Sequence, residues 1–166
     1  MSSTPQLVER NPQKYIAIRI KTDREKIGEV VPEIYAELAA WAARNNIAIS
    51  GAPIIRYFSI DYSTGTVDID AGFPISNDEA PAHARIKAGE LPGGTYAMLL
   101  HVGLYDTLYE TTAQLLAWGK EQGMNWPSQQ NAPLSTWPGR VEHYLAGPTD
   151  SRDPNDWKTE VAILVE

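Results

Sequence analysis

One acidic residue inside an otherwise apolar segment is the best candidate for chemistry in this chain. Glu142 lies in Val141-Glu142-His143-Tyr144-Leu145, where the alternation of an extended strand places Glu142 and Tyr144 on one face. Such an acid either faces solvent, the common outcome in an antiparallel sheet, or lies at the floor of an aromatic-lined cleft where burial raises its pKa. In the second case the carboxylate suits a cationic or polar aromatic ligand, and in an enzyme Glu142 would be the catalytic group that activates water.

The aromatic residues that could line such a cleft are mostly amphipathic, with five Trp and eight Tyr against two Phe. Trp41 and Trp118 fall on the faces of predicted helices that point toward the sheet, so core packing is the better interpretation for both. Trp126 and Trp137 lie in a connection marked by Pro and Gly, where a Trp either caps a pocket or anchors the loop. Trp157 begins the last predicted strand, and its position leaves both interpretations open.

Searches for other chemistry give no site. His83, His101 and His143 have no partner at metal-ligand spacing, so we expect structural or surface roles and no metal. Gly93-Gly94 precedes a predicted strand and lacks the Lys-Ser/Thr ending of a nucleotide loop, and no serine lies in a nucleophile elbow. We therefore expect no cofactor.

Length and charge limit the classes of protein. The chain has 166 residues, 21 acids, 14 bases and no cysteine, which predicts one domain and excludes disulfides and thiolate sites. The net charge of −7 argues against nonspecific binding to duplex DNA, which needs a basic face. No basic stretch followed by a long apolar run occurs near the start, so we predict a cytoplasmic protein without a membrane span.

The elements that must position these residues follow the same order twice. Periodicity predicts a strand over 15–21, a helix from 32 to about 45, and two strands over 54–62 and 67–75. A strand over 86–90 then precedes a second set, with a strand over 95–102, a helix over 105–122, and strands over 140–146 and 157–165. Residues 1–12 are polar and contain prolines, which predicts a flexible arm.

This order predicts an α+β fold made from a duplicated βαββ unit, although coincidence is the alternative. The two copies form one antiparallel sheet with both helices on one face, in a single domain over 13–166. Repeat one covers about 13–76 and repeat two about 84–166. The position that matches Glu142 in the first repeat is predicted to be Phe58, so a cleft between the halves would be aromatic on one side and acidic on the other.

The ordered motifs of the second half resemble the GyrI-like small-molecule-binding family, which includes effector-binding domains of bacterial multidrug-sensing regulators and gyrase-inhibitor proteins. The shared pieces are a glycine–tyrosine strand, a His-x-Gly-x-Tyr-Asp turn, a helical Trp, a Glu-x-Tyr strand and a Trp-x-Thr-Glu ending. In this chain they lie at Gly94-Thr95-Tyr96, 101–108, Leu116-Ala117-Trp118, 142–148 and 153–161. The likeness covers about 12–166, is strong after Gly93, and rests on element order before it.

The resemblance implies the duplicated βαββ fold with a ligand cleft between pseudo-symmetric halves. It also implies that the glutamate of the Glu-x-Tyr strand, here Glu142, contacts ligand at the cleft floor. The aromatic residues that match the lining are Tyr96, Trp118, Trp137 and Tyr144, with Phe58 from the first repeat and Trp126 as a further candidate from the connection. Because no helix-turn-helix module fits before Tyr15, we expect a stand-alone protein without direct nucleic-acid binding.

Three functions remain open at this stage. The leading hypothesis is a small-molecule-binding protein for drug-like aromatic or cationic compounds. The alternative, implied by the resemblance, is a hydrolase that opens the cyclopropane rings of DNA-alkylating natural products. The third is a gyrase-inhibitor-like protein with an unknown protein partner, which is supported only by an acidic surface that solubility explains more simply.

Overall fold

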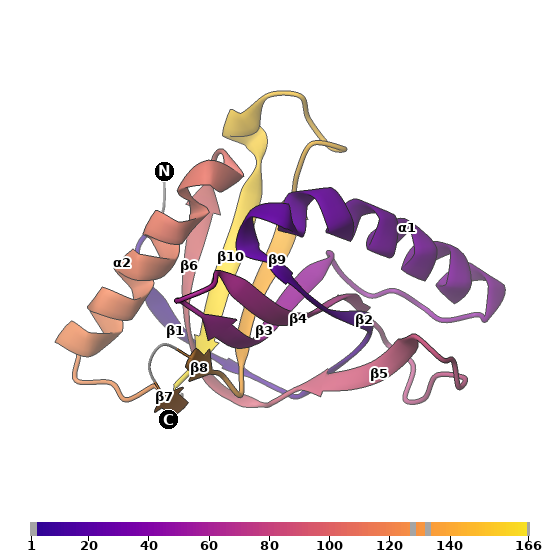
Figure 1. Cartoon of the computed structure of the whole chain (residues 1–166), viewed down its shortest axis with the longest axis horizontal. Coiled ribbons are helices and arrows are strands. Elements are labelled where there is room, and N and C mark those ends of the chain that lie inside the picture. The colour runs from indigo at the N-terminus through magenta and orange to yellow at the C-terminus, as the bar shows by residue number, and fades with distance from the viewer. Residues whose placement is uncertain (1–2, 127–128, 132–133, 166) are drawn as a thin grey trace.

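The computed structural model describes residues 3–126, 129–131 and 134–165, and its elements repeat one order twice (Figure 1). The first set comprises β2 (Gln13–Asp23), the 3-10 turn η1 (Arg24–Lys26), α1 (Ile27–Arg44), β3 (Ile54–Asp61) and β4 (Thr66–Pro74). The second set comprises β6 (Gly94–Val102), η2 (Tyr105–Thr107), α2 (Leu108–Glu121), β9 (Arg140–Ala146) and β10 (Lys158–Leu164). Outside the two sets lie β1 (Gln6–Arg10), β5 (Ile86–Leu91), β7 (Gln129–Asn131), β8 (Leu134–Thr136) and the 3-10 turn η3 (Pro154–Asp156).

The described strands form one sheet in which each pair is antiparallel. Its order is β1-β6-β10-β9-β3-β4-β2-β5, and β8 pairs with the end of β3 and with β7. Each half contributes three strands in mirrored order, with β9 and β3 side by side in the middle. This arrangement confirms the predicted α+β fold and its duplicated βαββ unit.

The register at the middle of the sheet shows which residues of the two halves are equivalent. Tyr15 of β2 and Tyr96 of β6 are equivalent, and the strand registers traced from them through β4 and β10 make Ile55 on β3 equivalent to Glu142 on β9, which is also its direct Cα partner. Tyr57 and Tyr144 each lie two residues further along their strands, on the same face, and are equivalent in the same way. The predicted match between Glu142 and Phe58 was therefore wrong, because a slip by an odd number of residues moves a strand side chain to the opposite face.

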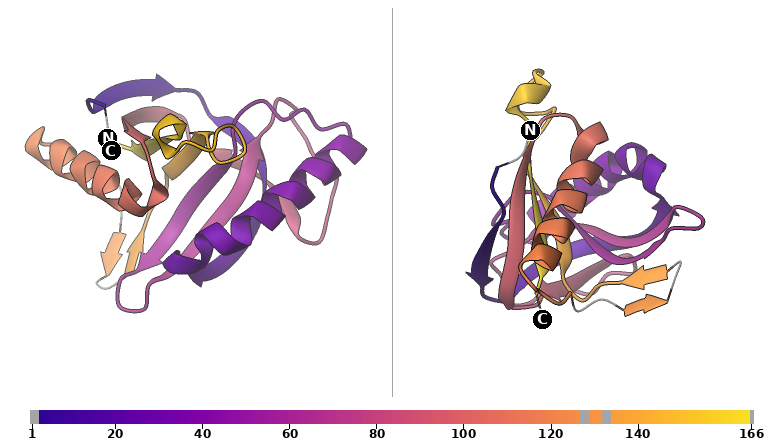
Figure 2. Two further views of the ribbon diagram at one scale, coloured as in Figure 1. Left: turned by 90° about the horizontal axis from the view of Figure 1, so that it is seen from above. Right: turned by 90° about the vertical axis from the view of Figure 1, so that its left-hand side faces the viewer.

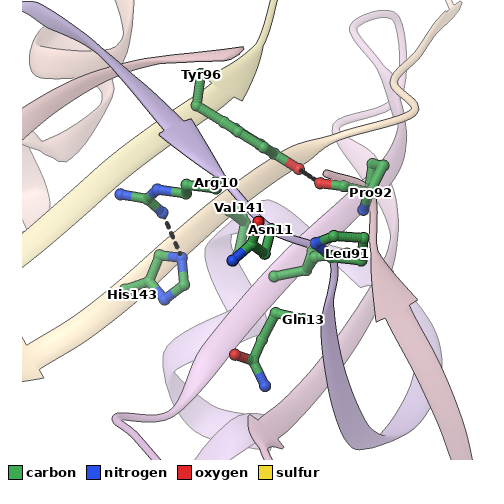
Figure 3. Close-up of a pocket in the computed structure, with 9 residues that line it drawn as sticks. Arg10, Asn11, Gln13, Leu91, Pro92, Tyr96, Val141 and His143 are labelled. Atoms are coloured by element: carbon green, nitrogen blue, oxygen red, sulfur yellow. Dashed lines mark hydrogen bonds between the residues drawn. The ribbon is translucent and has the colours of Figure 1, made fainter. Parts of the chain in front are cut away.

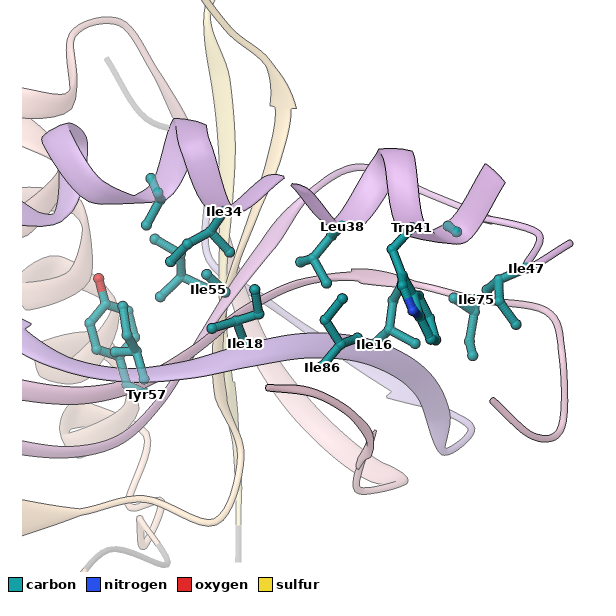
Figure 4. Packing of buried hydrophobic residues seen from close by; sticks show 14 of the residues in the cluster. Ile16, Ile18, Ile34, Leu38, Trp41, Ile47, Ile55, Tyr57, Ile75 and Ile86 are labelled. Atoms are coloured by element: carbon teal, nitrogen blue, oxygen red, sulfur yellow. The ribbon is translucent and has the colours of Figure 1, made fainter. Parts of the chain in front are cut away.

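Both helices cover the same face of the sheet. α1 packs on the first half through a cluster that includes Leu38 and Trp41, as Figure 4 shows. α2 packs on the second half through Leu115, which is fully buried. Ile55 belongs to the first cluster and Val161 to the second, and these two residues are the Cα partners of Glu142 on its neighbouring strands. Glu142 thus lies where the two helix-covered halves meet.

The opposite face of the sheet has its own small core. Tyr15 and Tyr96, the equivalent residues that begin the first strand of each half, are 1% and 2% exposed and pack there. β1 lies beside β6 at one edge and β5 beside β2 at the other, which both views of Figure 2 make visible for β1. Residues 6–10 belong to the predicted flexible arm, yet they pair with 94–98; residues 1 and 2 lie outside the described part.

Some boundaries differ from those that the sequence predicted. α1 begins at Ile27, so Pro32 lies inside the helix and not at its first turn, because Ile27 and Val31 extend the apolar face toward the N-terminus. α2 begins at Leu108 after a 3-10 turn. The polar connection before β9 contains β8, and this strand pairs with β3. Neither described helix has the length and apolar content that a membrane crossing requires.

Candidate functional site

Glu142 is a buried acid at the centre of the sheet. Glu142 is only 7% exposed, because Ile55 on β3 and Val161 on β10 flank it. Both of these neighbours are 1% exposed. Burial in this apolar setting raises the pKa of the Glu142 carboxyl above its ordinary value. The acid therefore faces the helix-covered side, between the two halves, and not open solvent.

Two tyrosine hydroxyls converge on one oxygen of this carboxylate. The Tyr144 hydroxyl donates to Glu142 Oε1 at 2.5 Å, and the Tyr57 hydroxyl donates to the same atom at 3.0 Å. Both bonds favour the charged form and so oppose the effect of burial on the pKa of Glu142. Among the described residues, no hydrogen bond reaches Oε2, which leaves that oxygen for a ligand or water.

Further aromatic rings extend this cluster. Tyr105 meets the Tyr144 ring edge-on with centroids 5.8 Å apart, and Trp157 stacks on Tyr105 at 5.3 Å. Tyr35 of α1 donates to the Ile54 carbonyl, and its pKa is raised by burial and then by the charge of Glu142. Aromatic side chains from both halves therefore surround one acid.

Four of these residues were not among the predicted site residues: Tyr35, Tyr57, Tyr105 and Trp157. Tyr105 and Trp157 lie in segments that carry the family resemblance, so their motifs were a usable signal. Tyr57 would have followed from the correct repeat register. For Tyr35, which lies on the apolar face of a helix, the sequence offers no signal that separates it from core.

Trp137 belongs to the edge of the cluster. It is 5% exposed, and its indole Nε1 donates to Ser135 Oγ at 3.0 Å. The Arg140 guanidinium lies 4.9 Å from the Trp137 ring and 5.5 Å from the Tyr57 ring. Trp137 therefore approaches Glu142 only through Arg140 and Tyr57.

Trp118 of α2 and Trp126 of the connection after it pack against the apolar cluster that contains Leu115 and Trp137. The Trp126 ring lies against Gly119, where an added Cβ would come within 2.2 Å of the ring. A glycine at this place thus lets the connection close over the helix. Neither residue has a hydrogen bond or ring contact with Glu142 in the described part of the chain, so their ligand-binding role stays a prediction.

Tyr96 and Phe58 lie on the face of the sheet away from Glu142. The Tyr96 hydroxyl donates to the Pro92 carbonyl at 2.6 Å. Phe58 lies between two guanidinium groups, with Arg19 at 4.1 Å and Arg56 at 4.7 Å from its ring. The structure therefore does not bring these two predicted site residues together with Glu142.

A cavity of about 290 Å³ opens on that opposite face (Figure 3). It is lined by Tyr96 and by Val141 and His143, the strand neighbours of Glu142 that point the other way. Arg10 lines it too, bonded to Glu160 at 2.5 Å and to His143 Nε2 at 3.4 Å. Beside Glu142 itself the two tyrosine hydroxyls occupy Oε1, and the predicted cleft there stays a prediction.

The histidines have structural contacts. His101 is 1% exposed, and its ring bonds the Thr111 hydroxyl at 2.6 Å and the Leu104 carbonyl at 2.8 Å. His83 accepts from the backbone amides of Arg85 and Ile86. Within the described ranges, no three His, Asp or Glu side chains gather as a metal site would require.

The sequence matches one known family over almost its whole length. A model of the GyrI-like small molecule binding domain matches residues 3–166. The chain belongs to this family. No protein of curated function matches this GyrI-like domain by sequence.

Several solved structures share the fold of this GyrI-like domain. The C-terminal domain of EcmrR matches with a TM-score of 0.80 and 20% identity, over 98% of this chain and 97% of that one. The EcmrR chain in a DNA complex matches with a TM-score of 0.80 and 21% identity, and this chain spans 57% of its length. SAV2435 bound to tetraphenylphosphonium matches with a TM-score of 0.63 and 14% identity, over 99% of this chain and 94% of that one. A hydrolase from Listeria innocua matches with a TM-score of 0.62 and 14% identity, over 98% of this chain and 91% of that one.

Proposed function

We propose that this GyrI-like domain binds aromatic, cationic small molecules, and that Glu142 is the charge that selects them. The observation behind the proposal is a single buried carboxylate whose Oε1 is held by Tyr57 and Tyr144 while Oε2 is unpaired among described residues. A cation near Oε2 would restore a partner that burial removed, and an effective dielectric constant of 20 gives two charges at 4 Å about 4 kcal/mol. The surrounding rings would add stacking and cation–π contacts.

A similar structure supports the same ligand class. SAV2435 was solved with tetraphenylphosphonium, a cation surrounded by phenyl rings. That chain shares only the fold with this one, so the support is by analogy. The proposal therefore needs a direct test of whether charge or shape decides binding.

The test compares two probes of nearly equal shape by titration calorimetry. Methyltriphenylphosphonium is a cation, and triphenylphosphine oxide is its neutral counterpart. We expect the wild-type protein to prefer the cation, and Glu142→Gln to weaken cation binding by roughly 100-fold while changing the neutral probe by less than threefold.

The matched control is Glu160→Gln. This variant removes an equal charge from the neighbouring strand, on the face where Glu160 pairs with Arg10. Cation binding should stay within about threefold of wild type. An equal loss for both probes in Glu142→Gln would show that the carboxylate contributes shape alone and would overturn the proposal.

A second function, hydrolysis of a cyclopropane ring, is favoured by one feature. A carboxylate with a raised pKa and an unpaired oxygen, beside two tyrosine hydroxyls, has the groups needed to take a proton from water and give one to an opening ring. The water oxygen would bond to a ring carbon as the carbon–carbon bond breaks. Mass spectrometry of a cyclopropane-bearing alkylator would detect the hydrated product, and equal amounts from wild type and Glu142→Ala would exclude turnover.

A further inference from the structure

Arg140 is a buried cation with one guanidinium nitrogen that has no hydrogen-bond partner. The residue is 7% exposed, and its Nη1 atom is fully covered with no hydrogen-bond partner. Its guanidinium lies near the Trp137 and Tyr57 rings, and its charge acts to lower the pKa of Glu142 without a hydrogen bond between the two side chains. No carboxylate of the described residues lies within ion-pair distance of it.

The other arginines on described strands, Arg10, Arg19 and Arg56, have polar partners. Arg10 binds Glu160, and Arg19 binds Asp68 at 2.9 Å. Arg56 also has one covered nitrogen without a partner, but its terminal nitrogens bond three oxygens on the opposite face. An unpaired buried donor costs about 1–3 kcal/mol and more when it is charged, so native proteins supply a partner.

The position of Arg140 connects it with Glu142. Arg140, Glu142 and Tyr144 alternate along β9 and share one face, with about 7 Å between successive members of the row. A second unpartnered buried atom, Thr159 Oγ1, lies at the other end of this row, since Thr159 is the Cα partner of Tyr144. Unfilled hydrogen-bonding capacity therefore flanks the acid on both sides.

We propose that Arg140 is a ligand-binding residue of the Glu142 site, and that the preferred ligand carries a carboxylate or another strong acceptor in addition to its cation. This inference rests on the proposed function of Glu142. The cation pairs with Glu142, and the acceptor pairs with the guanidinium about two residues along the same strand. Because Nη1 is covered in this structure, the acceptor reaches it when the Tyr57 or Trp137 ring shifts.

The test uses two phosphonium cations that differ only in the acceptor. (4-Carboxybutyl)triphenylphosphonium carries a carboxylate on a short methylene spacer, and its methyl ester lacks that charge. By titration calorimetry at neutral pH we expect wild-type protein to bind the acid roughly tenfold more tightly than the ester, the size of one charge-assisted hydrogen bond. This measurement needs no variant and so does not depend on whether a substituted protein folds.

Variants then assign the preference to one residue. Arg140→Met keeps the volume and removes the charge, and we expect it to abolish the preference for the acid. Arg140→Lys should retain part of it. Arg19→Met removes an equal charge from an arginine that stacks on Phe58 on the opposite face, and it should keep the full preference.

The outcomes separate the two proposals. If the ester binds through Glu142 and the acid binds no more tightly, Arg140 is not a ligand-binding residue, and the proposed function stands. If the acid is preferred equally by wild type and Arg140→Met, another residue holds the acceptor, and the inference is wrong. If neither phosphonium binds wild type, both proposals fail.

Discussion

The two halves of this domain share one scaffold but differ at the positions that meet in the middle. Tyr57 of the first half and Tyr144 of the second are equivalent, and both donate to the same oxygen. Ile55 and Glu142 are also equivalent, yet one is apolar and the other ionisable. The duplicated scaffold therefore presents a symmetric pair of hydroxyls, and the difference at one pair of equivalent positions places a single charge between them.

The helices differ in the same way. Tyr35 lies six residues before Trp41, and Thr112 lies six residues before Trp118. Tyr35 reaches the Ile54 carbonyl beside β3, while the Thr112 hydroxyl bonds back to its own helix at 3.3 Å. Both halves thus contribute rings to the site, but only the second contributes the acid. Three predictions test this difference between the halves.

The largest effect is expected when the acid is copied into the first half. Ile55→Glu places a second carboxylate directly beside Glu142, where burial and like charge both oppose ionisation. We expect a loss of about 4 kcal/mol in the free energy of unfolding, measured in urea at neutral pH. Ile55→Val, the control, should cost about 1 kcal/mol. Similar stability of the two variants would mean that the middle of the sheet tolerates two acids.

A medium effect should distinguish the two equivalent tyrosines. Removing the hydroxyl in Tyr144→Phe takes away the 2.5 Å bond to Glu142, and in Tyr57→Phe the 3.0 Å bond. We expect losses of about 2 and 1 kcal/mol at neutral pH, because a hydrogen bond to a charged group contributes more as it shortens. Tyr109→Phe, at a tyrosine that is 60% exposed, should change nothing measurable. The reverse ranking would contradict the geometry.

The smallest effect is a gain in stability from removing the charge. The folded-state pKa of Glu142 is raised above its ordinary value of 4.5, so ionisation opposes folding. The stability that protonated Glu142 contributes below pH 4.5 is lost as pH rises through the folded-state pKa. Glu142→Gln should therefore be more stable than wild type at neutral pH by about 1 kcal/mol, a common gain when a functional charge is removed.

The control for this change is pH itself. Below pH 4.5 Glu142 of the wild type is protonated and uncharged, like the glutamine of the variant. The difference in stability between the two proteins should therefore shrink there. Thermal unfolding at both pH values measures it. A variant that is less stable than wild type at neutral pH would show that the tyrosine bonds outweigh the effect of burial.

The sequence predicted the architecture well because periodicity and element order report it directly. Tyr15 and Tyr96 mark equivalent strands, and Leu115 lies as far before Trp118 as Leu38 does before Trp41. The site was predicted less completely. Connections of different length shift the offset between the repeats from element to element, so Phe58 was matched to Glu142 in place of Ile55, and Tyr57 was missed.

Other errors had local causes. The strand over 6–10 is mostly polar and has no alternating apolar face, so pattern alone could not reveal that it pairs with β6. Tyr96 was placed beside Glu142 because aromatic type does not reveal which face a strand residue occupies. Only the pairing of strands settles that question, and pairing depends on contacts between distant parts of the chain.

The pairing of β1 with β6 and of β3 with β9 also sets an order in time. During synthesis β1 emerges early, yet its partner is made only when residue 102 has left the ribosome. β3 is complete at Asp61, and its partner β9 ends only at residue 146. The first half therefore exposes β3 as an open edge until β9 has been made, and Glu142 and Tyr57 meet only then.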